Sequence, residues 1–232
     1  MDIILYVAAI AAMIFALWAQ FKVQSTFNKY SRVNTASGGT AAQVAEMILR
    51  SNGVYDVRVE RVGGNLTDHF DPRSNTLRLS DSVYGSTSAA AIGVAAHEAG
   101  HAIQHAEEYL PIKVRSLLVP VTNFSSRISW LVIMLGFLMM GFAGDTGIGY
   151  YVALVGIALF AITTVFQLVT LPCEFDASRR AMQALGASGR YTHTELSASR
   201  KVLTAAALTY VAALAVSLIQ LLRLINSINR RR

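Results

Sequence analysis

The stretch VAAHEAGHAIQH, residues 94–105, holds three of the chain's five histidines and contains the pattern H-E-x-x-H. On a helix, residues four apart are offset by roughly 40° and 6 Å, so His97 and His101 can offer ring nitrogens to one ion. Glu98 can then take a proton from water, because zinc lowers the pKa of a water molecule towards about 7 and polarises a peptide carbonyl. The pattern predicts zinc-dependent hydrolysis rather than a helix with incidental histidines.

A third protein ligand is needed, because a catalytic zinc usually has three and keeps one position open. His105 continues the same stripe of the helix. It lies about 12 Å of helical rise beyond His97, whereas two nitrogens on one zinc are at most about 4 Å apart. We therefore expect His105 to be a surface residue or to support the ligands from outside.

The best candidate for the third ligand lies in TLPCEFDASRRAMQAL, residues 170–185, directly after a long apolar stretch. Pro172 is expected to open a helix there, with Glu174 and Asp176 in its first turn. Glu174 is the first choice as ligand and Asp176 the second. Alternatively, the two acids only complement the helix dipole, and Asp176 pairs with Arg180.

Two further residues are weaker candidates. His69, in TDHFDP, can line the cleft or steady an oxyanion, and its strand can offer a backbone edge to an extended peptide. We favour a hairpin histidine without such a role. Tyr210, in ALTY, can donate to the oxyanion, although a tyrosine on an apolar helix is more often a packing residue or an interfacial anchor.

The composition indicates a membrane protein, because 53% of the residues are hydrophobic and only 15% are charged. Four stretches lack charged residues, namely 3–21, 128–144, 146–173 and 202–222. Since roughly 20 apolar residues cross a bilayer, about four transmembrane helices are expected. The first is expected to be an uncleaved anchor, since no basic segment precedes it. The alanine-rich fourth can instead be a helix buried against protein.

Basic residues beside these stretches predict the orientation of the chain. They are Lys22, Lys29, Arg32, Lys113, Arg115, Arg127, Arg179, Arg180 and Arg190. They place 22–127 and 173–201, and hence the active site, in the cytoplasm, and the single Cys173 is compatible with a reducing compartment. A fully crossing fourth helix would leave the basic tail outside, against the rule. The net charge of +6 is therefore a membrane-flank signal and does not indicate nucleic-acid binding.

The polar region between the first two spans is expected to combine helices with a short sheet. A helix is predicted over 37–53, with Thr40 as N-cap and Gly53 as its stop. Strands are predicted over 54–62, 66–70 and 75–80, with a tight turn at 63–64 and a second turn at DPRSN. A helix over 86–110, ended by Pro111, carries the histidines.

The expected fold class is an α+β membrane protein, mostly helical, with a small zincin-like cytoplasmic region. Five segments follow: an anchor (1–21), the zincin-like region (22–127), a transmembrane hairpin (128–173), a cytoplasmic helix with the third ligand (174–201), and a hydrophobic helix with a basic tail (202–232). The hairpin returns the chain to the side on which it left, so Glu174 can approach the histidine helix.

The chain resembles the YugP-like membrane zinc metallopeptidases of bacteria. The resemblance runs through LTDHFDPR, LRLS, VAAHEAGHAIQH, RSLLVPVTNFSS, VTLPCEFDASRRA and AAALTYVAA, and so through nearly the whole chain. Cys173 stands where valine is expected, and Phe70 where tyrosine is common. The resemblance implies a Zn²⁺-dependent endopeptidase of the cell membrane, in contact with lipid and acting on polypeptides. Substrates and protein partners of the group are poorly defined.

The chain is also similar to peptidases of the HtpX and CAAX-protease type, which are gluzincins. In these enzymes the glutamate of E-x-x-A-D completes H-E-x-x-H. Ser178 replaces the aspartate here, so a carboxylate that braces a ligand histidine is not assured at that position.

Three functions compete. The preferred one is an integral-membrane zinc endopeptidase that acts on membrane or unfolded proteins. An intramembrane site-2-type protease is disfavoured, because polar strands precede the histidine helix and HAEEY follows it. The alternative is a non-proteolytic membrane assembly factor with a structural zinc site, which normally requires a fourth protein ligand.

Overall fold

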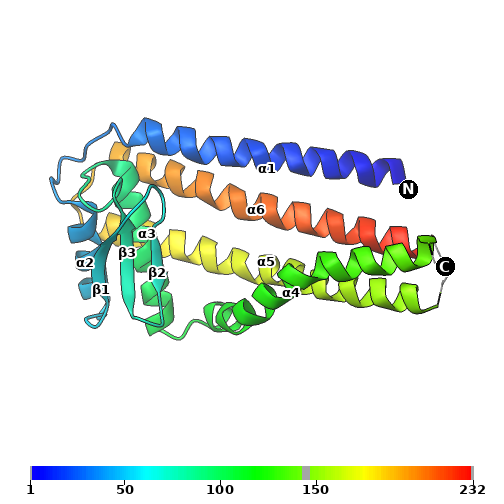
Figure 1. Cartoon of the computed structure of the whole chain (residues 1–232). Coiled ribbons are helices and arrows are strands. Elements are labelled where there is room, and N and C mark those ends of the chain that lie inside the picture. The colour runs from blue at the N-terminus through cyan, green and yellow to red at the C-terminus, as the bar shows by residue number, and fades with distance from the viewer. Residues whose placement is uncertain (1, 143–146, 231–232) are drawn as a thin grey trace. The chain divides into compact units, whose positions relative to one another are not determined.

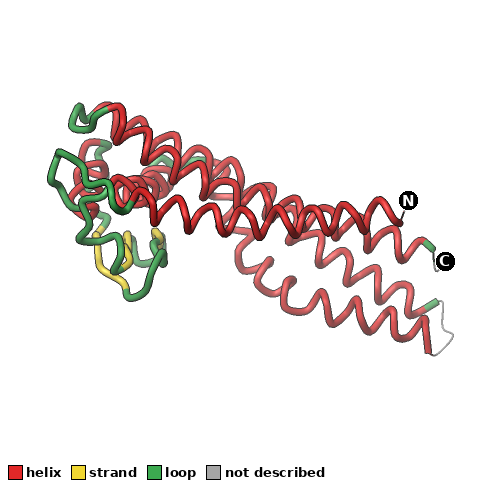
Figure 2. Tube along the Cα trace, turned by 90° about the horizontal axis from the view of Figure 1, so that it is seen from above, coloured by secondary structure: helices red, strands yellow, loops and turns green. Residues whose placement is uncertain are grey.

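The computed structural model describes residues 2–142 and 147–230 of the chain. Its elements are α1 (Asp2–Tyr30), α2 (Ala41–Ser51), β1 (Arg58–Val62), β2 (His69–Asp71), β3 (Thr76–Ser80), α3 (Ala89–Ala106), α4 (Leu110–Phe142), α5 (Ile148–Ala187) and α6 (His193–Asn229) (Figure 1). Helices make up most of the described chain, and the strands are short (Figure 2). The fold is the expected mostly helical α+β class.

The chain divides into two compact units. The first unit comprises Met1–Trp18, Val114–Leu171 and Tyr210–Arg232, and the second comprises Ala19–Lys113 and Pro172–Thr209. Four helices are long and apolar enough to cross a membrane: Ile3–Tyr30, Leu110–Gly141, Ile148–Ala187 and His193–Asn229. This confirms the expected number of membrane helices. All the strands lie in the second unit.

The sheet has the strand order β1-β3-β2. Strand β1 pairs with β3 in parallel, and β2 pairs with β3 antiparallel around the expected DPRSN turn. The tight turn expected at Gly63 and Gly64 does not join two paired strands, because β3 lies between β1 and β2. That part of the prediction is wrong. One consequence is that β2 lies at an edge of the sheet.

Side-chain caps begin the two short helices. The Thr40 hydroxyl accepts a hydrogen bond from the Gln43 backbone, and the Gln43 side chain accepts one from the Thr40 backbone, so α2 begins with a capping box. Ser88 caps α3 in the same way, through the backbone N–H of Ala91. In both helices, the side chain of the capping residue accepts a hydrogen bond from a first-turn backbone N–H group that has no partner within the helix.

Two predicted helix boundaries are wrong, and both involve proline. Helix α3 ends at Ala106, before the positive φ of Glu108, whereas Pro111 lies in the first turn of α4. A proline is tolerated there because first-turn N–H groups have no partner within the helix. Pro172 does not open a helix, since α5 continues through it from Ile148 to Ala187. Glu174 therefore lies far from a helix N-terminus, and the dipole interpretation fails.

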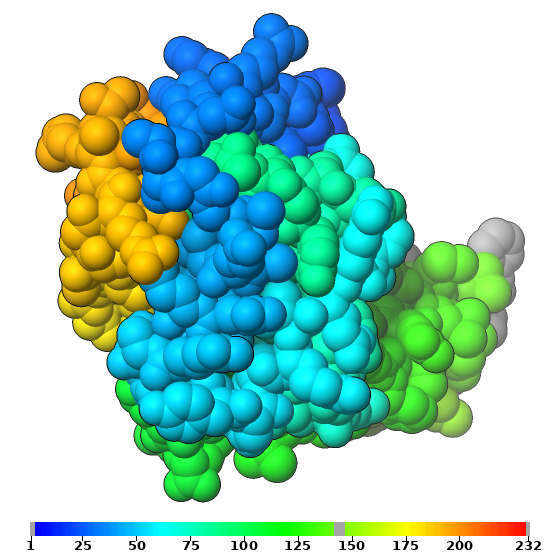
Figure 3. All heavy atoms as spheres, turned by 90° about the vertical axis from the view of Figure 1, so that its left-hand side faces the viewer, coloured from blue at the N-terminus to red at the C-terminus, as the bar shows by residue number. Residues whose placement is uncertain are grey.

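The core of the second unit joins α2, α3 and the sheet. Its fully buried side chains include Ile48, Leu49, Leu77, Leu79 and Ile92. Figure 3 shows the face of this unit on which α2 and the strands lie beside each other. Through this core, α3 packs against α2 and the sheet. The same helix carries the histidines.

Small residues of α3 allow two other helices to approach closely. A Cβ added at Gly93 would lie 3.1 Å from Cβ of Ser199 on α6, and one added at Gly100 would lie 2.6 Å from the carbonyl oxygen of Ala177 on α5. The second distance leaves no room for a methyl group. Glycine at position 100 is thus required for the contact between α3 and α5.

We expect Gly100→Ala to destabilise the protein by about 1–3 kcal/mol, because the added methyl group meets backbone atoms that cannot move independently. Gly186→Ala is the matched control. It lies in the last turns of α5, and beyond its own helix turn no atom of the described chain lies within 4 Å of the added Cβ, so it should be neutral or stabilising by up to about 1 kcal/mol. Thermal unfolding in detergent micelles measures both. Equal melting temperatures would contradict the close contact.

Candidate metal centre

His97, His101 and Glu174 come together in the second unit. One ligand atom from each can be chosen so that all three lie within 4.8 Å of one another. The Glu174 Oε2 atom lies 3.2 Å from Nε2 of His97 and 3.5 Å from Nε2 of His101. Two residues come from α3 and the third from α5, and Glu174 lies more than 70 residues after both histidines in the sequence. Among the described residues, this is the group of His, Cys, Asp and Glu side chains arranged to hold a metal ion.

The convergence has a simple origin. His97 and His101 are one helical turn apart on α3, so their rings point the same way. Glu174 precedes Ala177 by three residues on α5, and Ala177 is the residue that touches Gly100. The close crossing of the two helices thus brings the carboxylate to the ring nitrogens.

The chemistry of the donors suits a zinc ion. Glu174 is 2% exposed and His101 is 8% exposed, so the carboxylate and this ring are withdrawn from water. A buried carboxylate needs compensating partners, and here it faces two imidazole rings. Two nitrogens and one oxygen are the ligand set of a catalytic zinc that keeps a fourth position open. The residues present therefore fit the ion.

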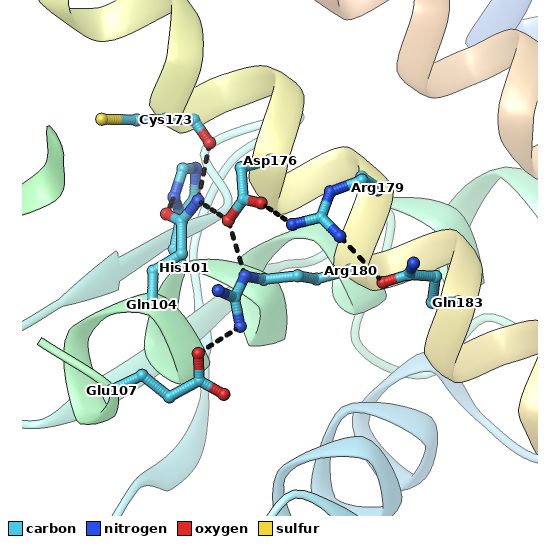
Figure 4. Close-up of polar contacts among 8 residues, drawn as sticks. All are labelled: His101, Gln104, Glu107, Cys173, Asp176, Arg179, Arg180 and Gln183. Carbon is cyan, nitrogen blue, oxygen red and sulfur yellow. Dashed lines mark hydrogen bonds and ion pairs between the residues drawn. The ribbon is translucent and has the colours of Figure 1, made fainter. Parts of the chain in front are cut away.

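Gln104 orients His101 (Figure 4). Its Oε1 lies 3.1 Å from Nδ1 of His101, and its Nε2 donates to the carbonyl oxygen of Cys173 at 2.8 Å and to Asp176 at 2.9 Å. Because the Gln104 amide nitrogen is a donor to both oxygens, its amide oxygen must accept from Nδ1–H of His101. This contact fixes the orientation of the ring, so that Nε2 is the nitrogen that faces Glu174.

Asp176 does not join the ligand group. Its carboxylate binds Gln104, forms an ion pair with Arg179 and accepts from Nε of Arg180 at 2.6 Å (Figure 4). Arg180 also binds Glu107 at 2.6 Å. The expected pairing of Asp176 with Arg180 is present, and of the two candidate acids only Glu174 lies at the histidines.

Ser178 contacts the other histidine. Its hydroxyl oxygen lies 3.1 Å from Nδ1 of His97, so a neutral hydroxyl, and not a carboxylate, contacts this ring. Sequence reasoning identified this position but missed Gln104. The available signal was its spacing, because a residue three positions after His101 lies on the same face of the helix.

Glu98 is 9% exposed on α3 and stays outside the group of three. Burial raises the pKa of its carboxyl group to about 7, although the charge of His97 and a hydrogen bond from the Phe70 backbone act in the opposite direction. Its proton affinity therefore lies near neutral pH, which suits a group that must both accept and release a proton. Phe70 belongs to β2, so the carboxylate faces the edge strand.

The remaining candidates lie elsewhere. His69 is exposed on β2, with Nδ1 2.8 Å from the carbonyl oxygen of Thr67. His105 is exposed, and its ring stands 5.8 Å from that of Phe70, which agrees with its exclusion as a ligand. Tyr210 is half-buried on α6 and belongs to the first unit, whereas the ligand group belongs to the second. The suggested roles of His69 and Tyr210 remain predictions.

We expect Gln104→Leu and Ser178→Ala each to weaken zinc binding about 10–100-fold, the usual effect of losing a group that orients a ligand. The fold should be retained, since leucine is close to glutamine in size. Gln183→Leu is the control, because Gln183 is exposed and accepts a hydrogen bond from Arg179 at 3.4 Å, away from the histidines. Zinc competition with a chromophoric chelator measures the affinities. Unchanged affinity in both variants would refute the orienting roles.

An H-E-x-x-H helix whose histidines meet a glutamate from a distant helix has the ligand arrangement of zinc metallopeptidases, here in a chain with four helices suited to a membrane. The family described as "Putative neutral zinc metallopeptidase" matches residues 5–229, and the chain belongs to this family. It is 48% identical over 216 residues to a Bacillus subtilis (strain 168) protein named "Putative membrane protease YugP". The match covers 93% of this chain and 92% of that protein. No solved structure matches the chain.

Proposed function

We propose that the protein is an integral-membrane zinc endopeptidase that hydrolyses peptide bonds of membrane or unfolded proteins. The observation that carries the proposal is the meeting of His97, His101 and Glu174 within 4.8 Å. In the proposed site, all three bind the ion through the atoms that face one another. A bound zinc ion supplies Lewis acidity, which makes water more acidic and polarises a carbonyl.

Glu98 is the proposed general base. Its carboxylate takes a proton from the attacking water and returns it to the leaving amine, and a pKa near 7 allows both transfers. Ser178 and Gln104 contact the Nδ1 atoms of His97 and His101, so the Nε2 atoms of both rings face Glu174 and are the atoms proposed to bind the ion.

The proposed peptide-binding element is the edge strand β2. It pairs with β3 on one side, and Phe70 on this strand is hydrogen-bonded to Glu98. An extended peptide can add to such an edge by backbone hydrogen bonds, which would bring its scissile bond towards the general base. The basic residues around 22–127 and 173–201 support a cytoplasmic location for the site.

A structural metal site in a non-proteolytic assembly factor is less well supported. Such a site is normally closed by four protein ligands. Among residues 2–142 and 147–230, the group contains three, which leaves one position for water and substrate.

The test is a proteolysis assay on the purified full chain in detergent, with casein as an unfolded substrate. We expect about one zinc per chain by elemental analysis, cleavage that stops when 1,10-phenanthroline removes the zinc, and recovery when zinc is restored. A protein that binds stoichiometric zinc but cleaves neither casein nor a peptide library would refute the proposal.

A further inference from the structure

A cavity of about 420 Å³ lies between α5 and α6 within the second unit. Its walls combine apolar and cationic side chains, among them Phe175, Met182, Leu203, Ala207, Arg179 and Arg200. None of the described residues that line it is acidic. The volume is in the range of small-molecule binding sites, and the charge favours an anionic ligand.

The arginines and most of the apolar lining residues occupy different levels along the helices. Arg179 lies eight residues before the end of α5 at Ala187, and Arg200 lies seven residues after the start of α6, which is about 11–12 Å of rise in both cases. Phe175 and Ala207 lie about 18–21 Å from the same helix ends. The helices are joined by the short segment 188–192. The two arginines therefore share one level, and Phe175 and Ala207 lie further from the joined helix ends, whereas Met182 lies closer to the end of α5 than Arg179 does.

The apolar residues Phe175 and Ala207 lie beside or inside the long uncharged runs of the sequence. Phe175 follows the uncharged run 146–173, and Ala207 lies inside the uncharged run 202–222. Phe175 is 50% exposed. Counted from the joined ends of both helices, the arginine comes first and the apolar, uncharged run follows, which is the order of charged headgroup and acyl chain in one leaflet of a bilayer.

Arg200 is available for a ligand. Its side chain is exposed and has no hydrogen bond or ion pair with the residues that the structure describes. Arg179 differs, because it already pairs with Asp176. A phosphate group can accept from both guanidinium groups, and it would leave Arg200 better paired than in the protein alone.

We propose that this cavity binds an anionic phospholipid of the membrane, with its phosphate between Arg179 and Arg200 and the start of an acyl chain along Phe175, Leu203 and Ala207. A peptide carboxylate is less suitable, because it does not account for the apolar residues that lie beside or inside the uncharged runs. Ser178 lines the same cavity and contacts His97, so the lipid would lie behind the candidate metal centre. Binding does not depend on catalysis.

The test is native mass spectrometry of the full chain in detergent, titrated with phosphatidylglycerol or phosphatidylcholine. We expect preferential binding of phosphatidylglycerol, and a loss of about fivefold in affinity for Arg200→Gln, the effect of one basic group at a lipid phosphate. Lys201→Gln is the matched control. It removes the same charge one residue further along α6, at an exposed position that does not line the cavity. Thr204→Phe, from an exposed lining position, should block binding by filling the cavity.

Several outcomes would overturn the proposal. Equal losses for Arg200→Gln and Lys201→Gln would indicate attraction to general surface charge. Equal binding of both lipids would remove the role of the anionic headgroup. Displacement by glycerol 3-phosphate at equal concentration would point to a free phosphate ligand, and displacement by an acidic peptide to a polypeptide. Melting temperatures and zinc content of the variants verify folding, and these readouts do not depend on whether the protein cleaves peptides.

Discussion

Glu98→Gln is expected to retain one zinc per chain and to lose proteolytic activity by about 10²–10⁴-fold, the usual contribution of a positioned general base. Glutamine has the size and shape of glutamate but no basic carboxylate. Glu98 lies outside the group of candidate ligands, so the substitution leaves that group intact. Elemental analysis and casein cleavage, measured on the same preparation, separate metal binding from proton transfer.

The control for this variant is Glu46→Gln, at an exposed position on α2. It makes the same chemical change away from the centre and should keep both zinc and activity. The mechanism is wrong if Glu98→Gln cleaves casein at the wild-type rate. Loss of zinc from Glu98→Gln would instead assign Glu98 to metal binding.

Glu174→Gln and His97→Ala are expected to lose stoichiometric zinc, with affinity falling more than the roughly 10–100-fold caused by losing a supporting group. Each removes one of three donors, and too few protein ligands then remain to hold the ion. Activity should fall with metal content and recover little at high zinc. Zinc titration by calorimetry measures the effect directly.

Asp176→Asn provides the comparison for Glu174→Gln, because the two acids are neighbours and the substitutions are equivalent. Asp176 contacts Gln104 and two arginines rather than the ligand atoms, so its loss should weaken zinc binding only through Gln104, by roughly 10–100-fold at most. Zinc retained in Glu174→Gln but lost in Asp176→Asn would reverse the assignment.

The features that sequence predicted correctly depend on local order or on composition. The cap at Thr40 involves residues three apart, and the pairing of two histidines on α3 needs only helical spacing. Membrane helices are recognisable because every residue of a span must tolerate hydrocarbon. The errors occur where local signals conflict with packing. Pro172 lies inside α5, and the turn at Gly63 and Gly64 joins strands that β3 separates.

The sequence by itself determined the membrane helices, the histidine pair and the family, since each is written in contiguous residues. Only the tertiary structure decided that Glu174 meets the histidines while Asp176 turns to Gln104, and that Ser178 reaches His97. These contacts join residues about 70 to 80 positions apart, so local spacing carries no information about them. They depend on how closely α5 crosses α3, and that distance is set by the absence of a side chain at Gly100 against Ala177.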